Sequence, residues 1–259
     1  MDQQTATFKW SATRTINWIF FIMLGMEILI VLLDGVITYA RTIQHDSIRG
    51  MFNITREDSL GTWFSCLQAF LVGMAFLLVA RSQSLIGNPK WKMIGWTLIG
   101  CFFLYVSVDD GIKFHERIGT FFGDLSEEKV DDGHTDTIYE RITYFPSYYW
   151  HIFFMPIFIC FGMFMFTFLM RELKSWQLRI MLVTALSFFV ISQALDYLEN
   201  IDEVHEWVQD TFFLREYTVM HFSKSIEEFM EMFGTTLFLM IALRYLLDHF
   251  NELRFKFQK

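Results

Sequence analysis

Six stretches of about 20 mostly apolar residues divide this sequence, and they constrain its fold more than any other feature. A helix needs about this length of apolar sequence to cross the hydrocarbon core of a bilayer. The stretches cover residues 17–40, 63–80, 92–110, 148–170, 180–200 and 225–243. Trp63, Trp91 and Trp150 lie near block ends, where aromatic rings settle at the level of the lipid headgroups. The sequence therefore predicts an all-α integral membrane protein, a bundle of six transmembrane helices.

The composition agrees with this interpretation and indicates a single domain. The chain is 53% hydrophobic and contains 31 Phe but only 3 Pro, as expected of a polytopic membrane protein. The first stretch follows a polar lead of 16 residues and carries two acids, so we expect it to stay as the first helix and not to be a cleaved signal peptide. We find no internal repeat, and only the segment 117–147 separates two stretches widely. We expect one polytopic membrane domain over residues 1–259.

The distribution of basic residues predicts the orientation. Residues 1–16, 81–92, 171–179 and 244–259 together hold 12 Lys and Arg and 4 acids. The alternate segments 41–62, 111–147 and 201–224 hold 9 Lys and Arg and 16 acids. Short cytoplasmic loops carry the excess of basic residues, so the first set is expected to be inside. Both termini would then be cytoplasmic, in a multi-pass protein of the inner or plasma membrane.

Nine acidic residues lie within the apolar stretches. They are Glu27, Asp34, Asp109, Asp110, Asp196, Glu199, Glu227, Glu228 and Glu231. A charged side chain at bilayer depth costs about 2.5 kcal/mol or more unless it finds a partner, so such residues are functional candidates. We expect no basic partner for them in the same spans, which points to bound cations or shared protons. For Asp110, Glu199 and Glu227 the alternative is a hydrated first or last turn of a helix.

The predicted orientation places several of these acids in one layer. With a rise of about 1.5 Å per residue, five side chains from five helices lie roughly 9–12 Å above the bilayer centre. They are Asp34, Asp109, Asp196, Glu228 and His151. Residues seven apart share a helix face, so Glu27 and Asp34 point the same way. If the third helix continues straight, Asp109 and Glu116 also share a face, and His115 and Glu116 lie about 20 Å above the centre, either capping the site or wet.

Crowded carboxylates repel one another unless positive charge is supplied, and a metal ion is one solution. The expected ligands are Asp109, His115, Glu116, His151, Asp196, Glu199, Glu228 and Glu231. This oxygen-rich set with a few imidazoles favours a divalent ion, Fe or Mn, with Ca or Mg as alternatives. Di-iron and di-manganese helix bundles use similar ligands, but their Glu-x-x-His spacing is absent here. Glu27 and Asp34 are the expected catalytic residues, lining the floor of the site and handling protons.

The predicted function is that of a membrane-embedded metal-binding protein. We expect the inner halves of the helices to carry no charged residue, so the site is expected to open only to the extracytoplasmic face. This favours a metalloenzyme, an oxidoreductase or a hydrolase, with a lipophilic or periplasmic small-molecule substrate. Besides the lipid bilayer, a membrane-protein partner or a homo-oligomer is expected, and no nucleic acid. The alternatives are a cation or proton-coupled transporter using the same acids, for which Glu27 is the main argument, and a non-catalytic subunit of a larger membrane complex.

Overall fold

The structure is a computed structural model and describes residues 11–131, 138–199 and 201–249. Within these residues, every regular element is a helix. Six helical segments are long and apolar enough to cross a membrane, and they overlap the six stretches that the sequence predicts. They are α1 (Ala12–Leu33) with the π-helix η1 (Asp34–Tyr39), α3 (Leu60–Leu85), α4 (Lys90–Ile112), α7 (Trp150–Glu172), α8 (Trp176–Glu199) and α10 (Glu216–His249). The six-helix membrane class is confirmed at this level.

The last helix differs most from its predicted bounds. The sequence predicts residues 225–243, whereas α10 is 34 residues long and begins at Glu216. Its first turns are polar and include His221 and Lys224. Hydropathy detects only the apolar part of a helix, so it misses turns whose polar side chains point into a bundle.

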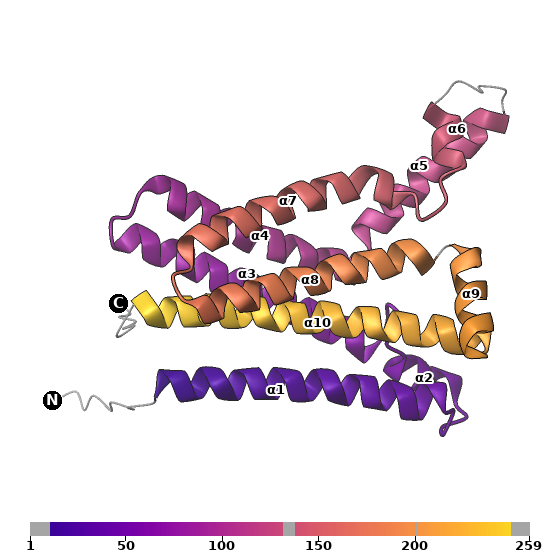
Figure 1. Cartoon of the computed structure of the whole chain (residues 1–259), viewed down its shortest axis with the longest axis horizontal. Helices are drawn as coiled ribbons and strands as arrows, with labels where there is room; N and C mark the ends of the chain where they lie inside the picture. The colour runs from indigo at the N-terminus through magenta and orange to yellow at the C-terminus, as the bar shows by residue number, and fades with distance from the viewer. Residues whose placement is uncertain (1–10, 132–137, 200, 250–259) are drawn as a thin grey trace, which may run out of the picture.

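Four shorter helices lie at one end of the bundle. They are α2 (Asp46–Phe52), α5 (Phe114–Asp131), α6 (Ile138–Thr143) and α9 (Asp202–Phe212). The start of α1 and the end of α10 lie at the opposite end (Figure 1). All three long connections are therefore on the same side, the one that the charge distribution predicts to be outside.

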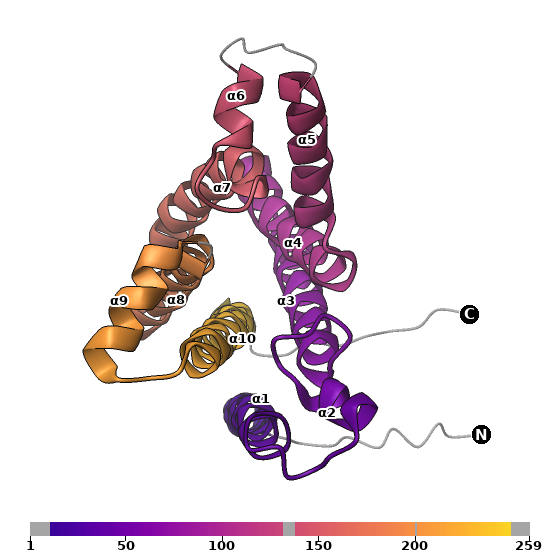
Figure 2. The same cartoon turned by 90° about the vertical axis from the view of Figure 1, so that its right-hand side faces the viewer.

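Helix α10 is the centre of the bundle. It packs against α1, α3 and α8, while α3 pairs closely with α4. Figure 2 shows α10 between α1 and α8, with α3 and α4 on its other flank. In α10, 67% of the most apolar window is buried inside the protein, against 17% in α1 and in α7. The two peripheral helices thus leave most of their apolar surface for lipid.

The core lies among α3, α4 and α10. Phe76, Trp96 and Phe238 are fully buried there, and the ring of Phe76 stacks on that of Trp96 with centroids 5.8 Å apart. Gly73 and Gly100 allow the close pairing of α3 with α4. A Cβ added at either glycine would lie 3.0 Å from the carbonyl oxygen of the other. Small residues at such crossings let two helix backbones approach in membranes.

Glu27 joins α1 to this core. Its carboxylate is fully buried, and Oε1 accepts hydrogen bonds from Gln68 Nε2 of α3 at 2.8 Å and from Thr236 Oγ1 of α10 at 2.6 Å. Gln68 Nε2 also donates to Thr236 Oγ1 at 2.8 Å. Three helices are therefore linked by one polar group near the middle of the bundle. Such hydrogen bonds between membrane helices stabilise association by roughly 0.6–2 kcal/mol each.

This geometry makes a prediction about the two substitutions Glu27→Leu and Glu27→Gln. Leucine would remove the acceptor of the Thr236 hydroxyl and one of the two acceptors of Gln68 Nε2, and it should destabilise the protein by about 1–3 kcal/mol. Glutamine keeps a carbonyl oxygen that can accept both bonds, so its melting temperature in detergent should stay close to that of the parent protein. We call the group of Glu27, Gln68 and Thr236 the clamp, because its hydrogen bonds hold α1, α3 and α10 together without needing a charge on Glu27. If glutamine is as damaging as leucine, the negative charge of Glu27 is needed, and this role is contradicted.

Candidate metal centre

Three carboxylates converge where α8 and α10 meet near the end that carries the short helices. Asp196 and Glu199 share one face of α8, and Glu227 belongs to α10. One oxygen from each lies within 4.8 Å of the other two. Two ligands of one ion, each bound at about 2.0–2.6 Å, can be at most about 5 Å apart, so this spacing fits a single cation. Glu227 was missing from the predicted ligands.

Lys224 contacts all three carboxylates. Its ammonium nitrogen lies 2.8 Å from Glu227 Oε1, 3.3 Å from Asp196 Oδ1 and 3.4 Å from Glu199 Oε2. The expectation that these acids have no basic partner is therefore wrong. The sequence held the signal, because Lys224 lies one helical turn before Glu227 on the same face of α10. Three carboxyl groups thus share one ammonium group.

His151 lies next to this group and has an unused ring nitrogen. The side chain is 1% exposed, and Nε2 is 3.4 Å from Asp196 Oδ2. Within the residues that the structure describes, neither of these two buried atoms has a hydrogen-bond partner. The other ring nitrogen, Nδ1, is 3.0 Å from the carbonyl oxygen of Tyr148, and the imidazole stacks on Trp150. The ring is thus held with Nε2 directed at Asp196, the orientation that a metal ligand requires.

Tyr148 lies beside the same carboxylates, just before α7 begins. Burial, together with the negative charges of Glu199 and Asp196, raises the pKa of the Tyr148 phenol to about 12. The phenol therefore keeps its proton at neutral pH. It is available as a hydrogen-bond donor to an anion at the edge of the group.

A second set of acids adjoins the first. Asp110 of α4 and Glu228 and Glu231 of α10 are half-buried. Glu231 Oε1 accepts a hydrogen bond from Ser192 Oγ at 2.5 Å, which ties α10 to α8. The charges of Asp110, Glu228 and Glu231 act on one another, and that of Asp196 acts on Glu231. The acids from α4, α8 and α10 therefore form one electrostatically coupled cluster.

His115 reaches Asp109 by a turn that the sequence did not predict. Helix α4 ends at Ile112, and Lys113 adopts the left-handed conformation with φ 51°. The backbone N–H of His115 then donates to Asp109 Oδ1 at 3.0 Å, and its ring Nδ1 contacts Asp109 Oδ2. The interpretation of a straight third helix, with His115 about 20 Å above the bilayer centre, is therefore wrong.

Glu116 points to a different partner. Lys113 Nζ lies 2.9 Å from Glu116 Oε1 and 3.0 Å from Glu57 Oε1. This ion-pair group is partly exposed and lies after the end of α4. Glu116 makes no hydrogen bond to the acids of α8 and α10 in the described part of the chain.

The two expected catalytic residues lie on α1 and η1 and have partners of their own. Asp34 Oδ2 is 2.9 Å from His221 Nε2 and accepts a hydrogen bond from Ser225 Oγ at 3.2 Å, while Oδ1 accepts from the backbone N–H of Ile54 at 3.3 Å. Glu27 is held by the clamp described above. Among the described residues, neither acid is hydrogen-bonded to Asp196, Glu199 or Glu227. They form a separate polar interface between α1 and α10.

Comparisons with known proteins identify the family of this chain but give no function for it. Neither the curated proteins nor the solved structures include a match. One family model, described as a domain of unknown function (DUF8692), matches residues 19–246. This match includes every helix from α2 to α9 and most of α1 and α10. The chain therefore belongs to the family described as domain of unknown function DUF8692.

Proposed function

We propose that this protein is a membrane-embedded metalloprotein whose divalent ion binds to Asp196, Glu199 and Glu227, with His151 Nε2 as a nitrogen ligand. The observation that carries the proposal is the pair of buried atoms without partners, His151 Nε2 and Asp196 Oδ2, which face each other at 3.4 Å. An unpaired buried polar atom costs about 1–3 kcal/mol. A cation between the two atoms would use both.

The charges of the group also favour a divalent ion. When all three are ionised, Asp196, Glu199 and Glu227 carry three negative charges, and Lys224 supplies one positive charge. A divalent ion supplies the remaining two and makes the group neutral, which matters where the surroundings have a low dielectric constant. In the metal-free protein the ammonium of Lys224 lies among the three carboxyl groups, next to Oδ1 of Asp196, while Oδ2 of Asp196 faces His151. The ammonium would move aside, toward Glu228, when the ion binds.

The ligand chemistry favours particular ions. Three carboxylates and one imidazole suit Fe or Mn best, and Ca or Mg are the alternatives. Asp110, Glu228 and Glu231 would provide the ligands for a second ion in a dinuclear centre. Asp109 and His115 complete the wall on the α4 side. In this proposal Glu116 has no direct role, because Lys113 holds it.

We further propose an enzyme, an oxidoreductase or a hydrolase, with its site open to the extracytoplasmic face. Beyond the acidic cluster, the bundle's other half contains the buried acid Glu172, and Lys92 neutralises it at 2.8 Å. A one-sided site suits an ion that activates water or oxygen better than an ion in transit. The excess of Lys and Arg at the opposite end supports cytoplasmic termini in an inner or plasma membrane.

One observation keeps the transporter as a second candidate. Glu27 Oε2 and Gln68 Oε1 are both buried and have no hydrogen-bond partner. Two such oxygens near the middle of the bundle would suit a transiently bound proton or cation. The discriminating result would be ion flux into liposomes that is lost on Glu27→Gln, the substitution that the clamp role predicts to be harmless.

The metal proposal predicts that the purified protein contains at least one Fe or Mn ion per chain by elemental analysis at neutral pH. Asp196→Asn and Glu227→Gln should each lower metal occupancy about tenfold or more, since even outer-sphere partners contribute about 10–100-fold to metal affinity. Asp58→Asn is the matched control, because Asp58 pairs with Arg56 at an exposed site. A protein that stays metal-free after incubation with Fe²⁺ and Mn²⁺ would rule out the proposal.

The position of Lys224 makes a second prediction, about Lys224→Met. The ammonium is a unit charge close to the ion's ligands, and at an effective dielectric constant of about 20 it repels a cation about 4 Å away by about 4 kcal/mol. Its removal should tighten Mn²⁺ binding at least about tenfold in a calorimetric titration. The metal-free variant should melt at a lower temperature than the parent protein, and added Mn²⁺ should bring its melting temperature back to that of the parent.

Lys113→Met is the control for this variant, because Lys113 pairs with Glu57 and Glu116 away from the cluster. Its Mn²⁺ affinity should equal that of the parent protein. If Lys224→Met loses stability and Mn²⁺ does not restore it, Lys224 is the permanent cation of the group, and the metal site is contradicted.

A further inference from the structure

An apolar groove on the surface of the bundle includes His151 in its lining. It lies between α6, α7 and α8 and has a volume of about 590 Å³, within the range of sites that hold a small organic ligand. Ile142 of α6, Met155 and Ile159 of α7 and Tyr197 of α8 form much of its lining. His151 also lines the groove, and Asp196 directly precedes Tyr197 in the chain. His151 therefore belongs both to the lining of the groove and to the candidate metal centre.

The α7 side of this groove would face the bilayer. Its lining includes Ile159 of α7, which is 55% exposed. Helix α7 is one of the six segments apolar enough to span a membrane and buries only 17% of its most apolar window. An exposed apolar side chain of a spanning helix faces hydrocarbon and not water. An acyl chain is the occupant that such a surface takes up.

The groove has one cationic side chain, Arg141 of α6. A guanidinium binds a phosphate oxygen pair with two parallel hydrogen bonds, which makes Arg a preferred residue for anionic headgroups. Arg141 belongs to a helix outside the spanning segments, while Ile159 lies two turns into α7. From His151 to Ile159 the helix rises about 12 Å, the depth available to an acyl chain. The junction between headgroup and chain would thus lie level with His151.

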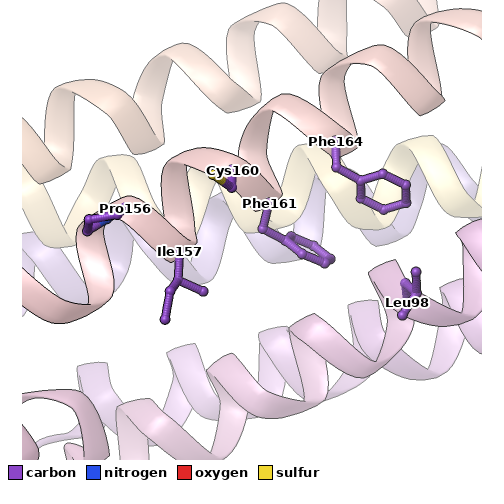
Figure 3. Close-up of a pocket in the computed structure, with 6 residues that line it drawn as sticks. All are labelled: Leu98, Pro156, Ile157, Cys160, Phe161 and Phe164. Atoms are coloured by element: carbon purple, nitrogen blue, oxygen red, sulfur yellow. The ribbon is translucent and has the colours of Figure 1, made fainter.

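A second hollow on α7 provides a comparison. It lies between α7 and α4, has the same volume of about 590 Å³, and is lined by Leu98, Ile157 and Phe161 among others (Figure 3). Pro156 lines both hollows. None of the residues around this second hollow is charged or belongs to the candidate metal centre. Of these two hollows in the described part of the chain, the groove at His151 is the one that combines an apolar lining with a cation and a residue of the candidate centre.

We propose that the groove binds a bilayer lipid with an anionic, phosphate-bearing headgroup, and that this lipid is the substrate of the metal centre. The proposal rests on the proposed function, since it names the substrate class of the same site. The lipid enters sideways from the bilayer between α7 and α8. Its headgroup phosphate binds Arg141, its chain lies along Met155 and Ile159, and its polar junction reaches His151 and Asp196.

The test uses two exposed isoleucines that lie two residues apart on α7. Ile159→Trp fills the groove at His151, and Ile157→Trp fills the hollow against α4. Native mass spectrometry of the full chain in detergent would measure the binding of phosphatidylglycerol and phosphatidylcholine. Ile159→Trp should weaken phosphatidylglycerol binding about tenfold, while Ile157→Trp should leave it unchanged. Arg141→Gln should abolish the preference for phosphatidylglycerol. If the two tryptophan variants behave alike, or if both lipids bind the parent protein equally, the lipid site is contradicted.

Two further measurements separate this inference from the proposed function. Elemental analysis should give the same metal content for Ile159→Trp, Arg141→Gln and the parent protein, because none of the changed residues is a ligand. Lipid binding without any metal would overturn the metal proposal and, with it, the role as substrate. Metal without selective lipid binding would overturn only the lipid site. Phosphatidylglycerol that stays chemically unchanged during long incubation with the metal-loaded protein would overturn its assignment as substrate.

Discussion

Ion pairs between one ammonium and three carboxyl groups tie α8 to α10 at the end of the bundle that carries the short helices. Asp196, Glu199 and Glu227 would repel one another if all three were ionised in a low-dielectric interior, and the ammonium of Lys224 offsets part of that repulsion. In our proposal a divalent ion offsets the rest, so this repulsion is the driving force for the proposed metal binding.

Helix α10 contributes residues to both polar groups of the bundle. Its first turns place Lys224, Glu227 and Glu231 against α8, and its opposite face places His221 and Thr236 against α1. The acids that lie around α10 therefore form two groups, one between α10 and α8 and one between α10 and α1. On the α8 side, His151 Nε2 and Asp196 Oδ2 are buried without a hydrogen bond in the described part of the chain, and His151 also lines the apolar groove, which is why we propose the chemistry there. On the α1 side, hydrogen bonds hold Glu27 and Asp34, which suits helix association, although Glu27 Oε2 and His221 Nε2 also have no hydrogen bond among the described residues.

Much of the fold could be predicted from the sequence, because apolar stretches of membrane-spanning length leave few alternatives to helices. The depth estimate also brought Asp196 and His151 to one layer, where they are 3.4 Å apart. Three features of the site could not be predicted from the sequence in this way. Lys224 was outside the apolar stretch that marked the last helix, so its contact with Glu227 was overlooked. The left-handed turn at Lys113 depends on a single backbone conformation that no local pattern announces. The separation of Glu27 from the cluster depends on which face of α10 meets α1, and that is decided by packing.

The most direct test of the metal centre is the structure of the protein loaded with Mn²⁺, with the ion located by its anomalous scattering. The account predicts an ion about 2.0–2.6 Å from oxygens of Asp196, Glu199 and Glu227 and from His151 Nε2, with the Lys224 ammonium displaced from its present position. An ammonium still centred among the three carboxylates at saturating Mn²⁺, with no anomalous signal there, would contradict it.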